Sequence, residues 1–365
     1  MNEYHTLNAG DGEQERSVRF TGNWREYLPI AASNVLLTIV TLGVYRFWAA
    51  ARQRRYLWSR TEVIDDTLEW TGTGREMFFG FLIVTAVLLP FFLFVQFAFP
   101  ALIARGKETA AGGLFTLFYV AIIYLGGVAR FRGLRYRLSR SWWRGIRGGS
   151  DEPGWNYGGE YLGRHALSAM TLFILFPWAA TRLWNSRWNA MSFGQLRFRT
   201  NLDATGLKRR WAGLYLIPPA VALTAGALAF VLVGGADRTT ADARFGFFGM
   251  LFLIVALFYV AIPLLTLHWF AKFYRRGAAS MTLGDLEFGF DAATWDWFKL
   301  FMGNIALAIG TLGFGLSYWG YRNWAFMIRH TELYGEVNVS FLTQSTTSAP
   351  TEAEGFADAF EIGAI

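Results

Sequence analysis

Long apolar runs alternate along the chain with short polar segments, and the longest runs carry no charge. Residues 77–104, 109–129, 211–236 and 245–271 contain no Asp, Glu, Lys or Arg. A helix needs about 20 apolar residues to cross a hydrocarbon core of about 30 Å. The pattern therefore predicts four full transmembrane helices, grouped as two hairpins over residues 77–129 and 211–271.

A shorter apolar motif occurs three times, before, between and after these two hairpins. In each copy a Thr is followed seven or eight residues later by a Trp, and an Arg ends the unit. The copies are Thr41/Trp48/Arg52, Thr171/Trp178/Arg182 and Thr311/Trp319/Arg322. Recurrence of one motif in a fixed order indicates internal duplication. The predicted repeats lie near residues 20–75, 156–210 and 294–341.

The distribution of Lys and Arg decides whether the three motif copies cross the membrane. If residues 27–45, 166–181 and 300–321 all crossed, the basic residues would divide as 16 on one side and 18 on the other. If all three return to the side they came from, only four basic residues face outward and 30 face the cytoplasm. The positive-inside rule favours the second arrangement. We therefore expect three re-entrant or interfacial helical elements, and both chain termini in the cytoplasm.

Short alternating segments follow the motif copies. Residues 67–70, 194–198, 284–288 and 335–339 alternate apolar and polar positions, and the last three begin with Gly. Alternation with period two predicts β-strands, which we expect to pair on the cytoplasmic side. The predicted fold class is an all-α polytopic membrane protein with internal repeats, four full transmembrane helices, three re-entrant or interfacial elements and short cytoplasmic strands.

Composition agrees with a membrane protein, since 53% of residues are apolar and only 17% are charged. We expect one repeat-built membrane domain over residues 19–341, between disordered tails at 1–18 and 342–365. The first 26 residues lack the apolar stretch of a signal peptide. The net charge of +7 is explained by basic loops between apolar runs, so nucleic acid is not an expected partner.

Polar side chains within the first and third motif copies are the candidate solute-lining residues. They are Asn34, Thr38, Thr41, Asn304 and Thr311. The first three recur at helical spacing, which would place them on one face of a helix. Asn and Thr at depth in a membrane either contact a polar solute or hydrogen-bond between helices. Both interpretations stay open from the sequence.

Residues 130–147 form a second candidate site, because they contain seven Arg and no acidic residue. Arg130, Arg137, Arg140 and Arg144 are predicted to share one helical face. Such a face would bind anionic lipid headgroups or an anionic ligand. The alternative is a basic anchor that sets the topology of the chain.

No catalytic or metal-binding motif is found. The four His residues have no ligand spacing, the chain has no Cys, and phosphate-binding and dinucleotide-binding glycine motifs are missing. We expect no cofactor, no metal and no enzymatic activity.

The chain resembles the YjgN/DUF898 family of uncharacterised bacterial inner-membrane proteins. The resemblance rests on residues 20–56 (FTGNWREYLPIAASNVLLTIVTLGVYRFWAAARQRRY), 136–149 (YRLSRSWWRGIRGG) and 311–324 (TLGFGLSYWGYRNW). The middle copy departs from this pattern, with Phe173 where the others have Gly43 and Gly313. The resemblance implies a multi-pass protein of the bacterial inner membrane and supplies no activity.

Two functions from different classes remain. The first is transport or binding of a small solute or lipid, with anionic membrane lipids as partners. The second is a membrane scaffold that organises the envelope and binds a protein partner, or a second copy of itself, through its cytoplasmic strands.

Overall fold

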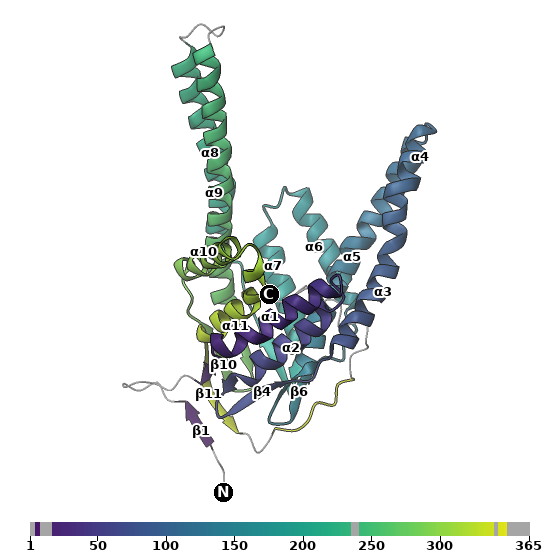
Figure 1. Ribbon diagram of the computed structural model, residues 1–365, viewed down its shortest axis with the longest axis vertical. Helices are drawn as coiled ribbons and strands as arrows, with labels where there is room; N and C mark the ends of the chain where they lie inside the picture. The colour runs from purple at the N-terminus through teal and green to yellow at the C-terminus, as the bar shows by residue number, and fades with distance from the viewer. Residues whose placement is uncertain (1–3, 8–16, 235–240, 339–341, 349–365) are drawn as a thin grey trace.

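A computed structural model describes residues 4–7, 17–234, 241–338 and 342–348. Within this part, β-strands form one sheet and helices rise from it in antiparallel pairs (Figure 1). Each helical pair is joined to the next by a β-hairpin, so that every pair begins and ends at the sheet. The order of the elements is thus a repeat of helical pair and β-hairpin.

The helices alternate between short and long pairs. The short pairs are α1 (Trp24–Val40) with α2 (Arg46–Ser59), α6 (Trp155–Met170) with α7 (Phe176–Asn189), and α10 (Thr294–Gly310) with η2 (Phe314–Tyr318) and α11 (Trp319–Arg329). The long pairs are α3 (Gly74–Leu93), η1 (Phe94–Ala98) and α4 (Phe99–Ala104) with α5 (Glu108–Arg140), and α8 (Leu207–Gly234) with α9 (Ala241–Ala279). Both long pairs and α6–α7 project from the same side of the sheet (Figure 1).

The sheet contains eleven antiparallel strands in the order β1-β11-β10-β9-β8-β7-β6-β5-β4-β3-β2. They are β1 (Tyr4–Leu7), β2 (Val18–Phe20), β3 (Thr61–Val63), β4 (Asp66–Trp70), β5 (Ser141–Trp143), β6 (Ile146–Gly149), β7 (Ser192–Phe193), β8 (Leu196–Thr200), β9 (Met281–Leu283), β10 (Leu286–Phe290) and β11 (Thr331–Asn338).

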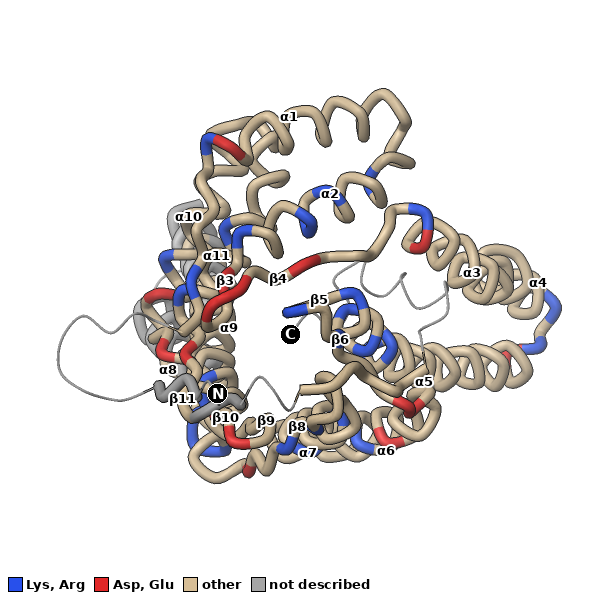
Figure 2. The backbone as a smooth tube through the Cα atoms, turned by 90° about the horizontal axis from the view of Figure 1, so that it is seen from below, with Lys and Arg blue, Asp and Glu red and all other residues tan. Residues whose placement is uncertain are grey.

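The sheet curves almost into a closed ring, with the helical pairs arranged around it (Figure 2). The gap lies between β2 and β11, where the Ser17 hydroxyl donates a hydrogen bond to the Leu333 carbonyl over 3.3 Å. Near-closure leaves few unpaired strand edges. It also brings the first and last helical pairs together, and the Tyr27 hydroxyl of α1 donates to the Ser317 carbonyl of η2 over 3.1 Å.

The all-α prediction is therefore wrong, because the short strands expected to pair belong to one eleven-stranded sheet that underlies the whole fold. The expected number of spans also fails. In the described part of the chain, two helical stretches are long and apolar enough to cross a membrane, Gly74–Ala104 and Glu108–Arg140. The four Gly-led or alternating segments overlap strands β4, β8, β10 and β11, although residues 194–195 and 284–285 lie in hairpin turns. The all-α prediction failed because strands of two to eight residues pair with partners distant in sequence, which local periodicity does not reveal.

The predicted tails fall partly outside the described residues, which exclude 1–3, 8–16 and 349–365. Residues 4–7 form β1 and pair with β11. Residues 342–348 cross the turns of the β5–β6 and β7–β8 hairpins. There Gln344 accepts from the Arg147 backbone N–H over 3.2 Å and donates to the Gly145 carbonyl over 2.7 Å.

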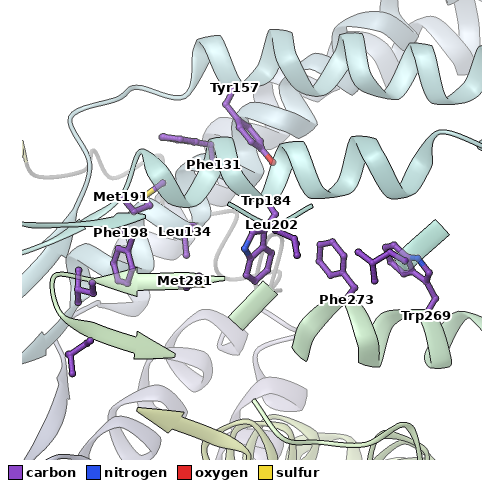
Figure 3. Close-up of a cluster of buried hydrophobic side chains, with 13 residues drawn as sticks. Phe131, Leu134, Tyr157, Trp184, Met191, Phe198, Leu202, Trp269, Phe273 and Met281 are labelled. Carbon is purple, nitrogen blue, oxygen red and sulfur yellow. The ribbon is translucent and has the colours of Figure 1, made fainter. Parts of the chain in front are cut away.

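The largest hydrophobic cluster joins the sheet to the helices above it (Figure 3). Trp184 of α7 packs edge-on against Phe273 of α9, with ring centroids 5.6 Å apart. Phe131 of α5 packs against Tyr157 of α6 at 5.6 Å. Buried aromatic pairs of this kind add stability beyond their buried area. The cluster thus fixes α5, α6, α7 and α9 relative to one another.

Candidate functional site: a central cavity

A cavity of about 530 Å³ lies between α2, α9, α10 and α11, with the lower part of α5 closing one wall. Its walls are mostly aromatic and aliphatic side chains. The aromatic lining residues are Trp58, Phe270, Tyr274, Trp297, Phe301, Trp319, Trp324 and Phe326. Ligand sites in proteins commonly have this volume and this apolar character, with a few polar groups for orientation.

Hydrogen bonds hold two of the indole rings in place. Trp58 and Trp324 stack with centroids 4.0 Å apart. The Trp58 Nε1–H donates to the Ser141 hydroxyl, and the Trp324 Nε1–H donates to the Thr61 hydroxyl, both over 2.8 Å. Because both indole N–H groups are satisfied behind the wall, the ring faces are held as a preformed apolar surface.

The polar lining comes from amides and guanidinium groups. Asn304 is 6% exposed and donates through Nδ2 to the Asn323 Oδ1 over 2.9 Å. Its own Oδ1 has no hydrogen-bond partner among the described residues. A buried acceptor left without a donor costs about 1 to 3 kcal/mol. Asn304 therefore presents an acceptor that a bound donor, or a water molecule, would satisfy.

The charge of the cavity wall is positive. Arg54 and Arg137 are among the lining residues, and none of the described lining residues is Asp or Glu. The Arg54 guanidinium lies over the Trp70 ring, 5.1 Å from its centroid. At a partly enclosed apolar wall, such cations attract anions more strongly than at a fully exposed surface. The arrangement suits a ligand with an apolar body and an anionic group.

Of the predicted solute-lining residues, the cavity includes Asn304 and not the other four. Asn34, the equivalent residue in the first motif copy, donates to the Ala49 carbonyl over 3.3 Å. It thereby ties α1 to α2 within the first motif copy. Thr38 donates to the Asn34 carbonyl one turn earlier over 2.6 Å.

Thr41 and Thr311 have a structural role at the turns of their hairpins. Each hydroxyl donates to the carbonyl four residues earlier, over 2.7 Å for Thr41 and 2.6 Å for Thr311. Each also accepts the backbone N–H four residues later, from Tyr45 and Gly315. The motif threonine therefore caps the end of one helix and fixes the start of the next.

The predicted basic face is divided by the structure. Arg130, Arg137 and Arg140 lie on α5, whereas Arg144 lies in the β5–β6 turn and pairs with Asp65. Arg140 pairs with Glu76 over 2.7 Å, and Arg130 contacts the Tyr161 hydroxyl. Only Arg137 of the four lines the cavity. The structure thus brings one residue from each predicted site, Asn304 and Arg137, to the same place.

Sequence reasoning missed the other polar lining residues, Gln53, Arg54 and Asn323. A signal existed, since Gln53 and Arg54 directly follow the motif residue Arg52, and Asn323 directly follows Arg322. In the described part of the chain, no group of three or more His, Asp or Glu side chains is placed to hold a metal ion.

Comparisons with known proteins place the chain in a family without an assigned activity. The family described as "Bacterial protein of unknown function (DUF898)" matches residues 15–359. Proteins named "Inner membrane protein YjgN" are similar. The one from Escherichia coli (strain K12) is 30% identical over 128 residues, which are 35% of this chain and 29% of that protein. The one from Salmonella typhimurium is 28% identical over 130 residues, 36% of this chain and 30% of that protein.

The matched segment thus spans less than a third of the length of these curated relatives. No solved structure matches the chain. The relatives' names and the two apolar helical stretches support a membrane protein with an inner-membrane location. With the family match extending over nearly the whole sequence, the chain belongs to the DUF898 family of bacterial proteins.

Proposed function

We propose that this membrane protein binds an anionic amphiphile, a membrane lipid with a negatively charged headgroup, in the central cavity. One observation carries the proposal: an aromatic cavity of about 530 Å³ with two arginines and no acidic residue in its described lining. Apolar surface binds the hydrocarbon part, while guanidinium groups bind a phosphate through charge-assisted hydrogen bonds.

The position of the polar groups favours one orientation of the ligand. Arg137 comes from the part of α5 close to the sheet, only three residues before the helix ends at Arg140. Asn304 belongs to α10, where its backbone carbonyl accepts the Trp319 Nε1–H over 3.0 Å. We expect the headgroup near Arg137, and the hydrocarbon chains along Phe270, Phe301 and Trp319.

Lipid retention by purified protein tests this proposal. The protein would be extracted in mild detergent, and its bound lipids would be counted and identified by native mass spectrometry. The variants are Asn304→Leu and Arg137→Gln. Their matched controls are Asn34→Leu, at the equivalent motif position outside the cavity, and Arg144→Gln, whose charge pairs with Asp65.

We expect bound anionic lipid in the wild type and in both controls, and loss of most of it in the two cavity variants. Equal lipid retention in all five proteins would show that the cavity is not the binding site. An absence of bound lipid from folded wild-type protein would contradict the proposed function itself.

A further inference from the structure

Arg187 is a buried cation that forms no ion pair with any of the described residues. It lies on α7, three residues after Trp184, and only 6% of it is exposed. Its Nε has no hydrogen-bond partner in the described part of the chain. The side chains that act most on its charge are those of Tyr157, Tyr274, Arg137 and Arg130, and none of these is a carboxylate. Other arginines of α5 and α6 are paired with carboxylates, as in Arg140–Glu76 and Arg164–Glu160.

A buried guanidinium of this kind is energetically costly. Charged side chains that leave water are normally paired or fully hydrogen-bonded. Burial lowers the pKa of Arg187, Tyr157 and Tyr274 raise it, and Arg137 and Arg130 lower it further. Arginine nevertheless stays protonated in proteins. The molecule therefore holds a fixed positive charge here, and two further cations lie close enough to repel it.

The site adjoins the central cavity. Arg137 and Tyr274 line the cavity, and both also act electrostatically on Arg187. The guanidinium groups come from two helices, α5 for Arg130 and Arg137 and α7 for Arg187. The cluster that contains Trp184, Phe131 and Tyr157 fixes these helices (Figure 3). The charges are thus held together by a packed core and not by mutual attraction.

We propose that Arg187 and Arg137 form a phosphate-binding site, with Arg130 as a third cation and the hydroxyl groups of Tyr157 and Tyr274 as additional donors. This inference rests on the proposed function and names the group that anchors the lipid. A phosphate accepts paired hydrogen bonds from a planar guanidinium, which makes Arg its usual partner in protein sites. The phosphate belongs either to a lipid headgroup or to a small soluble phosphate.

Thermal unfolding with inorganic phosphate tests the site without any lipid. The detergent-purified wild type would be compared with Arg187→Met and Arg187→Lys over a phosphate titration, using sulfate-free and phosphate-free buffer as baseline. The matched control is Arg182→Met, which removes an exposed arginine from the same helix. Arg187→Met keeps an unbranched side chain of similar length and removes the buried charge.

We expect phosphate to raise the melting temperature of the wild type and of the Arg182 variant. Phosphate affinity should fall roughly tenfold to a hundredfold in Arg187→Met, the range for loss of one charged hydrogen-bond partner. Arg187→Lys should bind phosphate with intermediate affinity, since lysine keeps the positive charge but lacks the planar guanidinium that donates paired hydrogen bonds. If phosphate stabilises the wild type and Arg187→Met equally, the site is not at Arg187.

Lipid retention separates this inference from the proposed function. In nanodiscs of phosphatidylglycerol and phosphatidylethanolamine, Arg187→Met should lose its preference for phosphatidylglycerol if the phosphate is a lipid headgroup. If the preference persists while the response to inorganic phosphate is lost, the site binds a soluble phosphate. If Arg187→Met retains both responses, the inference is wrong, although lipid binding in the cavity still stands.

Discussion

The turns of the three short helical pairs adopt one backbone conformation that requires two successive residues with positive φ. These residues are Leu42 and Gly43, Leu172 and Phe173, and Leu312 and Gly313. Glycine takes this conformation without strain, whereas an L-residue pays about 1 to 2 kcal/mol. Phe173, with φ of 62°, is thus strained at a position where the other two copies have glycine.

We predict that Phe173→Gly stabilises the protein by about 1 kcal/mol relative to Phe173→Ala, because both remove the ring and only glycine removes the strain. Thermal unfolding in detergent measures the difference. Gly43→Ala provides the reverse control and should destabilise by a similar amount, since no atom lies within 4 Å of the added Cβ and only the backbone is affected. Equal stability of the two Phe173 variants would contradict the argument.

Glu76 joins three parts of the structure at the start of α3. Its carboxylate pairs with Arg140 over 2.7 Å, accepts the Tyr136 hydroxyl over 2.8 Å, and closes a capping box with Thr73. We predict that Glu76→Gln destabilises the protein by about 1 to 3 kcal/mol, because the bond to charged Arg140 is lost along with the favourable helix-terminal charge. Chemical denaturation of the purified protein gives the value.

The Arg140 contribution can be isolated by a double-mutant cycle. If the ion pair matters, Glu76→Gln combined with Arg140→Gln should cost clearly less than the sum of the single changes. Additive costs would mean that Glu76 acts through its cap and the tyrosine alone.

At the scale of elements, helices and strands were predictable where the sequence repeats a local pattern. The apolar runs became α3–α5 and the α8–α9 pair, and alternating residues became β4, β8, β10 and β11. The predicted basic face requires one helix through residues 130–144, yet α5 ends at Arg140 and the chain turns into the β5–β6 hairpin. Ring closure depends on pairing between strands such as β4 and β5, separated by the whole α3–α5 hairpin. No local periodicity contains that information.

The candidate site was also predictable only in part, because local sequence patterns do not show which distant segments come together. Asn304 and Arg137 were selected as polar residues within apolar or basic runs, and both line the cavity. Arg187 was not selected, because a lone arginine in a polar stretch is normally exposed. Its spacing of three from Trp184 was the available indication that it lies on the same buried face of the helix.

Close packing of α5 against α6 provides a test at this scale. A Cβ on Gly158 would lie 2.6 Å from Val128 Cγ2, whereas nothing lies within 4 Å of a Cβ on Gly159. We predict that Gly158→Ala destabilises by about 1 to 3 kcal/mol through overpacking. Gly159→Ala on the same helix should be neutral or stabilise by up to about 1 kcal/mol. The unfolding midpoints of the two variants test this prediction. Destabilisation by both would mean that alanine is unfavourable throughout this helix, and that overpacking at Gly158 is not the cause.

At the scale of the whole molecule, the ring separates two chemically different regions. The turns of the short helical pairs carry exposed apolar side chains, including Leu42 at 94% and Leu312 at 92% exposure. In water such exposure would be unfavourable, and contact with hydrocarbon removes the cost. Basic residues gather near this part of the sheet, in the β5–β6 turn, on β6 and at the nearby end of α5 (Figure 2). We therefore expect the apolar side of the ring to face the membrane, with the sheet beyond the membrane surface.

This arrangement predicts where each connection is accessible in living cells. The α3–α5 pair leaves the sheet, and its tip carries Arg105 and Lys107 with exposed side chains. Asp151 and Thr205 are exposed in connections next to the sheet. Because the chain has no cysteine, single cysteines at Lys107, Asp151 and Thr205 can be labelled individually with a membrane-impermeant maleimide.

In intact cells we expect Lys107→Cys to react, and Asp151→Cys and Thr205→Cys to react only after the cells are opened, since the basic sheet side should be cytoplasmic. The opened cells serve as the control that each cysteine is reactive. Reaction of all three from the same side would show that the α3–α5 pair does not cross the membrane. In the inverse pattern, the two cysteines near the sheet react in intact cells and Lys107→Cys is protected. That result would mean that the α3–α5 pair crosses the membrane but that the sheet lies outside the cytoplasm. It would also place the Arg187 site next to the outer surface, where a soluble phosphate could reach it without entering the cell.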